Sequence, residues 1–120
     1  MDRLGGLLKD LRRFVTRRDW AQFHDPKNLA MAVASEAGEL LAEYRWVGNS
    51  AADNWSQDLG NRARVSAEVA DVGIALLLLC DRIGLDLVDV MRAKIRVNSV
   101  NYPVAAARGK ASRPSRLRRR

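Results

Sequence analysis

Apolar residues recur three and four positions apart along most of the chain, which is the spacing of an α-helix. The first such run covers residues 3–15 and predicts a helix. The second predicts a helix from Pro26 to about Val47, with Asp25 as its N-cap and proline at its first position. Residues 49–57 are polar turn-forming residues, which predict the main loop.

A third helix is predicted from Ser56 or Asp58 to about Ile83, where Gly84 is suited to end it. Asp86 is the expected N-cap of a fourth helix, which Pro103 would end. No stretch alternates apolar and polar residues as a half-buried strand does. The chain therefore predicts the all-α class and a four-helix bundle.

The net charge of +7 comes from the C-terminal end of the chain. Residues 108–120 hold seven basic side chains and no acidic one, which leaves 14 of each sign in residues 1–107. We therefore expect a helical domain over residues 1–107, without a basic nucleic-acid-binding face, and a disordered arginine-rich tail over residues 108–120. The tail would bind RNA or an acidic partner weakly, or serve only solubility.

The single cysteine, Cys80, excludes an intrachain disulfide and fits a reducing compartment. It lies in the apolar run VGIALLLLC, so we expect a buried thiol. The N-terminus lacks the apolar core of a signal peptide, and no apolar run is long enough to span a membrane. These features predict a cytoplasmic protein that does not enter a membrane.

Three acidic residues, Glu36, Glu39 and Glu43, border the apolar stripe of the second predicted helix. The stripe consists of Val33, Ala37, Leu40, Tyr44 and Val47. A solvated charged face would more often lie opposite the apolar one. These carboxylates are therefore expected close to the buried interior.

The third predicted helix repeats this arrangement with Glu68 and Asp71, which share a face just before its longest apolar run. In a bundle these acids would oppose Glu36 and Glu39. Four converging carboxylates repel one another unless a cation lies among them, and oxygen ligands favour Mg²⁺ or Mn²⁺. The alternative is that acids three residues apart occur on this helix by chance.

A di-iron bundle site is set aside because it requires histidines within the helices. The only histidine, His24, precedes the second predicted helix and is expected in a loop or at a pocket edge. On the fourth predicted helix, Lys94, Asn98 and Tyr102 share a face with Asn101. That face would suit a polyphosphate, or it is an ordinary solvated basic stripe.

With these features in place, the chain resembles the all-α nucleoside triphosphate pyrophosphohydrolases, the MazG-like superfamily, and within it the dCTP pyrophosphatase branch. Three segments carry the likeness: RDWAQFHDPKNLAMAVASEAGELLAEYRW, EVADVGIALL and KIRVNSVNYP. Together they cover most of residues 17–103, and their combination in this order is highly specific. The tail lies outside the resemblance.

The resemblance implies a role for each matching position. The Mg²⁺ ligands would be Glu36, Glu39, Glu68 and Asp71. The phosphates would contact Lys94, also an expected catalytic residue, and Asn98. The substrate pocket would further include Trp20, His24, Trp46 and Tyr102. Glu36 or Glu39 is the expected acceptor of the proton of the attacking water.

Three positions depart from the branch's pattern: Leu11 replaces a histidine near the base, Ala75 a tyrosine and Arg96 an acid. They leave the preferred base open, with dCTP or a modified dCTP among the candidates, and the manner of phosphate binding open too.

We expect a Mg²⁺-dependent enzyme that converts a nucleoside triphosphate to the monophosphate and pyrophosphate. The alternative is a non-enzymatic helical module acting through its tail. Because the third predicted helix is apolar nearly all round, and because of the resemblance, we also expect a dimer or tetramer.

Overall fold

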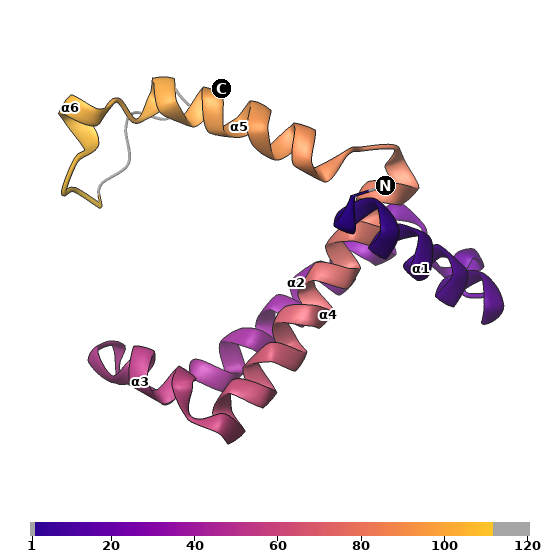
Figure 1. The fold of residues 1–120 in the computed structure, drawn as a ribbon, viewed down its shortest axis with the longest axis horizontal. Coiled ribbons are helices and arrows are strands. Elements are labelled where there is room, and N and C mark those ends of the chain that lie inside the picture. The colour runs from indigo at the N-terminus through magenta and orange to yellow at the C-terminus, as the bar shows by residue number, and fades with distance from the viewer. Residues whose placement is uncertain (1, 112–120) are drawn as a thin grey trace. The chain divides into compact units, whose positions relative to one another are not determined.

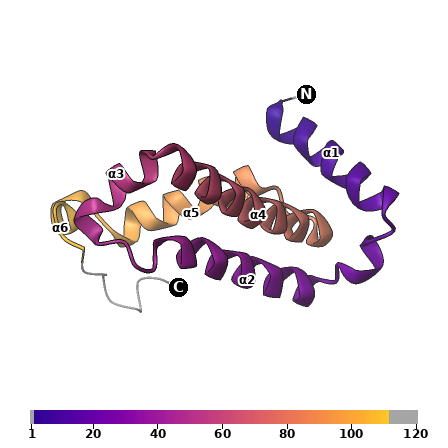
Figure 2. The ribbon, with the colours of Figure 1, turned by 90° about the horizontal axis from the view of Figure 1, so that it is seen from below.

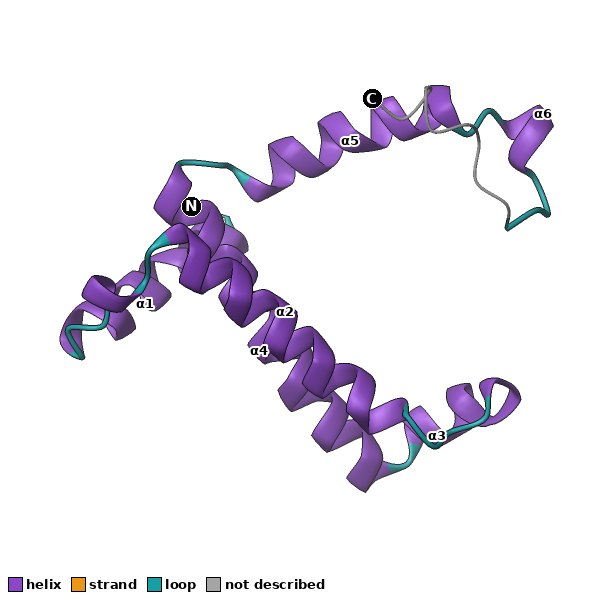
Figure 3. Ribbon diagram, turned by 180° about the vertical axis from the view of Figure 1, so that it is seen from behind, coloured by secondary structure: helices purple, strands orange, loops and turns teal. Residues whose placement is uncertain are grey.

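The computed structural model describes residues 2–111, and within that range every regular element is a helix. The α-helices are α1 (Arg3–Arg17), α2 (Pro26–Tyr44), α3 (Ala52–Gln57), α4 (Leu59–Ile83), α5 (Leu87–Asn101) and α6 (Val104–Ala107). Two short 3-10 helices, η1 (Ala21–Phe23) and η2 (Asn49–Ala51), precede α2 and α3. Figure 3 shows this all-helical composition, which confirms the predicted class. The chain divides into two units, Met1–Gly84 and Leu85–Arg120, which are described separately.

In the first unit, the long helices α2 and α4 lie side by side, as Figures 1 and 2 show from two directions. The buried side chains are few and mostly small or aliphatic. They are Leu11 and Val15 of α1, Leu29 of α2, and Ala75, Leu77 and Cys80 of α4. The predicted burial of Cys80 is confirmed. Since α2 and α4 form the main packing of this unit, side chains between them are held in a defined register.

Aspartate N-caps fix where the helices begin. Asp25 accepts a hydrogen bond from the backbone N–H of Asn28 at the start of α2, with Pro26 at the first helical position. Asp58 and Asp86 cap α4 and α5 in the same way. Gly84 ends α4 with a φ of 74°, a left-handed conformation that favours glycine. The boundaries predicted at Asp25, Gly84 and Asp86 are therefore confirmed.

The predicted loop over residues 49–57 is wrong, because this segment forms η2 and α3. The hydroxyl groups of Tyr44 and Ser56 lie 2.6 Å apart, and Ser56 Oγ donates to the carbonyl of Ala52 at 2.7 Å. The rings of Tyr44 and Trp55 are also in contact, with their centroids 5.0 Å apart. These contacts to the end of α2 outweigh the turn preference of the local sequence. The short helix α6 after Pro103 was likewise not predicted.

Part of the apolar surface of α4 and α2 is not covered within the first unit. On α4, Val69 is 52% exposed and Ile74 is 39% exposed, and on α2 Leu41 is 69% exposed. Within the first unit, α2 covers one side of α4, and α1 reaches only part of it. The remaining apolar side chains of α4 therefore stay at the surface of the described chain.

An ion pair joins α1 to the C-terminal half of α4. Arg12 donates from both Nε and Nη2 to the carboxylate of Asp81, with the shortest distance 2.6 Å. The hydrogen bond from Arg12 lowers the pKa of Asp81, against a smaller opposing effect of desolvation. The pair thereby holds α1 beside the part of α4 that adjoins the cavities described below.

The second unit contains α5 and α6. Asn101 is buried near the end of α5, and Tyr102 follows it as the C-cap. The tail predicted to be disordered spans residues 108–120, of which 112–120 lie outside the described residues. In the described part of the chain, no helix combines the length and apolar character needed to cross a membrane.

Candidate metal centre and substrate cavity

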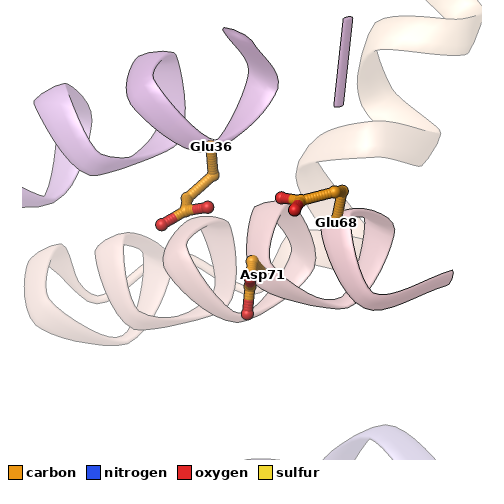
Figure 4. Close-up of side chains that lie close together, drawn as sticks. All are labelled: Glu36, Glu68 and Asp71. Carbon is orange, nitrogen blue, oxygen red and sulfur yellow. The ribbon is translucent and has the colours of Figure 1, made fainter. Parts of the chain in front are cut away.

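Three of the four predicted metal ligands meet between α2 and α4. One carboxylate oxygen from each of Glu36, Glu68 and Asp71 lies within 4.8 Å of the others. In Figure 4, Glu36 extends from α2 toward α4, and the carboxylate of Glu68 is directed toward it. Glu36 and Glu68 are half-buried and Asp71 is exposed. We call these three residues the acidic cluster.

The fourth predicted ligand, Glu39, is exposed and does not belong to this group. Glu43, the third acid beside the apolar stripe, forms an ion pair with Arg64 of α4 at 3.5 Å. The side chain of Glu43 is only 22% exposed, so its charge is both desolvated and partnered. Of the acids at this interface, Glu43 thus has its own counter-charge.

In the described part of the chain, no salt bridge offsets the negative charge of the acidic cluster. The pKa of Glu68 is raised, first because of desolvation and then because of the charges of Asp71, Glu39, Glu36 and Glu43. Without a cation, Glu68 therefore takes up a proton more readily than a free glutamate does. A divalent cation relieves the same repulsion, and carboxylate oxygens are the ligands that hard cations prefer.

A cavity of about 560 Å³ opens beside the cluster, with Glu36 and Asp71 in its wall. The rest of its lining is mainly apolar and comes from η1, α2 and α4: Phe23, Leu29, Met31, Ala32, Ile74, Ala75 and Leu78. Three polar side chains, His24, Asn28 and Ser35, interrupt this surface. Mostly apolar walls with a few polar groups are typical of small-molecule sites.

A second cavity of about 300 Å³ shares His24, Ile74 and Leu78 with the first. Its other lining residues include Leu11, Phe14 and Trp20. Trp20 is 44% exposed and packs edge-on against Phe14, with their centroids 5.7 Å apart. His24 lines both cavities, which agrees with its prediction as a pocket-edge residue.

Two of the three departures from the dCTP pyrophosphatase pattern line these cavities. Leu11 lies in the wall of the smaller cavity and Ala75 in that of the larger one, and both are buried. By the resemblance, the dCTP pyrophosphatase branch would have a histidine and a tyrosine at these two positions, where this chain has smaller or less polar groups. Arg96, the third departure, is exposed on α5.

The other predicted site residues belong neither to the acidic cluster nor to the lining of the two cavities. Trp46 is 86% exposed, with the guanidinium of Arg45 5.3 Å from its ring centroid. Lys94 and Asn98 are exposed on α5, and Tyr102 is half-buried after it. These three belong to the second unit. Their roles stay predictions.

Several residues that the structure brings to the site have no role predicted from the sequence. Asn28, Ser35 and Phe23 line the larger cavity, and Arg64 neutralises Glu43. Only Asn28 had a usable signal, because the predicted cap at Asp25 places it in the first turn of α2. The others depend on how the helices pack.

Comparison with known proteins identifies the family. The chain is 35% identical over 116 residues to dCTP pyrophosphatase 1 of Mus musculus, covering 93% of this chain and 68% of that protein. Its identity to dCTP pyrophosphatase 1 of Homo sapiens is also 35%, over 92% of this chain and 67% of the relative. The chain belongs to the dCTP pyrophosphatase family. No protein-family model matches the chain.

A solved structure supports the same assignment. The crystal structure of a pyrophosphatase from Archaeoglobus fulgidus matches this chain with a TM-score of 0.78 and 33% identity. The match covers 86% of this chain and 94% of that one. The dCTP pyrophosphatase homologue described here is therefore an enzyme, a nucleotide pyrophosphohydrolase with the all-α fold predicted for it. The alternative of a non-enzymatic module does not fit this membership.

The first prediction separates metal binding from ordinary acidic packing. Glu68→Gln removes one repelling charge and keeps the side-chain shape, so the metal-free variant should be at least as stable as wild type at pH 7. Because the folded-state pKa of Glu68 is raised, its charge opposes folding only as the pH rises through that pKa. The advantage of the variant should therefore vanish in acid, where Glu68 is protonated. Thermal unfolding of wild type and Glu68→Gln at pH 7 and in acid measures this difference in stability.

The same variant should lose most of the thermal stabilisation that Mg²⁺ gives wild type, because binding to the native state stabilises it. Asp53→Asn, which removes an exposed acid of α3, is the control and should keep the full response. A Glu68→Gln protein that is less stable without metal and keeps its Mg²⁺ response would instead identify Glu68 as a structural side chain.

Proposed function

We propose that this enzyme hydrolyses a nucleoside triphosphate, with dCTP or a modified dCTP as the leading candidates, to the monophosphate and pyrophosphate with Mg²⁺. One observation carries the proposal: carboxylate oxygens of Glu36, Glu68 and Asp71 lie within 4.8 Å of one another, and Glu36 and Asp71 line a largely apolar cavity of about 560 Å³. The relatives named above are dCTP pyrophosphatases, which supports a nucleotide as the occupant of that cavity.

Glu36, Glu68 and Asp71 would hold the cation, with Glu39 as a further ligand. Mg²⁺, or Mn²⁺ in its place, would supply charge stabilisation at the phosphoryl group and a more acidic water. Glu36 or Glu39 would accept the proton of that water as it attacks. The pKa of Glu68 is raised first by desolvation and then by the neighbouring acids, and a cation would relieve the second of these effects.

The base and the phosphates would be held by different parts of the chain. Trp20 and His24 adjoin the cavities and would contact the base or frame its pocket. Lys94 and Asn98 would neutralise and bind phosphate oxygens. Trp46 and Tyr102 complete the proposed substrate site on the strength of the resemblance. The apolar Leu11 and Ala75 favour a base pocket with room for a substituted base.

A pyrophosphate-release assay tests the proposal and its alternative together. The full chain and a chain truncated after Ala107 are assayed on dCTP with and without Mg²⁺. Since the tail lies beyond the resemblance, both should release pyrophosphate only with Mg²⁺, and at rates within about threefold of each other. Any nucleic-acid binding should disappear on truncation and weaken with salt.

Two results would contradict this account. Release that does not depend on a divalent cation would remove the role of the acidic cluster. A hundredfold loss on truncation would make the arginine-rich tail part of the site and overturn the proposed division into residues 1–107 and 108–120.

We also propose that the enzyme is a homo-oligomer that works in the cytosol, without a membrane or nucleic-acid partner as part of its main function. Large apolar side chains remain exposed on the two long helices of the first unit. They include Met31, Leu41, Leu59 and Val69, each more than half exposed. A second copy of the chain would bury such side chains, as subunit interfaces do.

Light scattering at micromolar concentration should therefore give a mass of at least twice the 13.4 kDa of one chain. Leu41→Glu places a charge on this apolar surface and should shift the mass toward one chain. The control, Lys27→Glu, introduces the same charge at an exposed position in the first turn of α2 and should leave the mass unchanged. A wild-type mass of one chain would contradict the proposal.

A further inference from the structure

Asn28 carries an amide group whose orientation is fixed by its neighbours. Its Nδ2 donates to the carbonyl oxygen of Phe23 at 3.1 Å, while its backbone N–H donates to Asp25 Oδ1 at 2.9 Å. A carbonyl oxygen can only accept hydrogen bonds, so the nitrogen of the amide must face Phe23. Within residues 2–111, no hydrogen bond reaches Asn28 Oδ1. The free group of the amide is therefore an acceptor.

Asn28 lines the larger cavity, together with Glu36 and Asp71. Eight residues of α2 separate Asn28 from Glu36, which is about 12 Å along the helix axis. That separation is comparable to the reach of a nucleoside from its first phosphate to the edge of its base. A nucleotide whose phosphates lie at the acidic cluster would thus extend its base toward Asn28.

We propose that Asn28 is a specificity-determining residue that selects bases carrying an amino group at the edge facing it, cytosine over uracil in particular. This inference rests on the proposed function. The Oδ1 atom would accept a hydrogen bond from the amino group of cytosine. Uracil presents a keto oxygen at the same position, so two acceptors would face each other without a proton between them.

The lock on the amide is what makes the selection possible. A free asparagine could rotate its amide by half a turn and donate to a keto oxygen instead. Here that rotation would break the bond to Phe23 and place Oδ1 against another acceptor. Since Asn28 is exposed and water competes for the acceptor, we expect about tenfold discrimination, less than at a fully buried polar site.

The test compares kcat/KM for dCTP and dUTP, which differ at this edge, in wild type and two variants of Asn28. Wild type should prefer dCTP by about tenfold or more. Asn28→Ala removes the acceptor and should bring the ratio close to one, mainly through a loss on dCTP. Asn28→Asp keeps an acceptor but loses the bond to Phe23, so it should retain the preference for dCTP.

The control variant is Asp58→Ala, which removes the N-cap of α4 and changes no residue that lines the larger cavity. It should lower the melting temperature and leave the dCTP to dUTP ratio unchanged. If Asn28→Ala lowered kcat/KM equally for dCTP and dUTP, Asn28 would serve only to anchor Phe23, and the inference would be overturned. Equal wild-type rates on dCTP and dUTP would overturn the inference but not the proposed function. No hydrolysis of either substrate would overturn both.

Discussion

The mutual repulsion of carboxylates held between two packed helices is the constraint on which the site depends. Glu36 comes from α2, whereas Glu68 and Asp71 come from α4, so these charges approach one another only because the two helices pack along their length. Desolvation and, after it, this repulsion raise the pKa of Glu68. Like charges held together oppose folding, so their presence here fits a site for a ligand. A divalent cation among the carboxylates would offset their repulsion and be bound by their oxygens.

The surrounding structure defines where a substrate can lie relative to these charges. Glu43 is neutralised by Arg64, whereas no salt bridge within residues 2–111 reaches the acidic cluster. Beyond Glu36 and Asp71, the wall of the larger cavity is mainly apolar and includes residues near the N-terminus of α2. The cap at Asp25 and the bond from Asn28 to Phe23 fix that end. One helix, α2, thus positions both the charged end of the cavity and the end at Asn28.

Features that depend on local chemistry, such as the helix ends, were predictable from the sequence. An aspartate followed by proline, and a glycine after a long apolar run, mark the helix ends at Asp25 and Gly84 whatever the tertiary fold. The acidic cluster was also predictable, because acids beside an apolar stripe must approach whatever covers that stripe. Helix α3 was not predictable from the sequence, since it depends on the contact between Tyr44 and Ser56. The pairing of Arg64 with Glu43 was not either, because it depends on the register between α2 and α4.

The most direct test of this account measures Mn²⁺ binding by electron paramagnetic resonance, without substrate or turnover. Wild type and Asp53→Asn, which changes an exposed acid outside the cluster, should bind Mn²⁺ alike. Glu36→Gln should bind it at least about tenfold more weakly, because loss of a direct ligand costs no less than loss of a group that supports one. Mn²⁺ binding by Glu36→Gln with wild-type affinity would contradict the claim that the acids between α2 and α4 form a metal site.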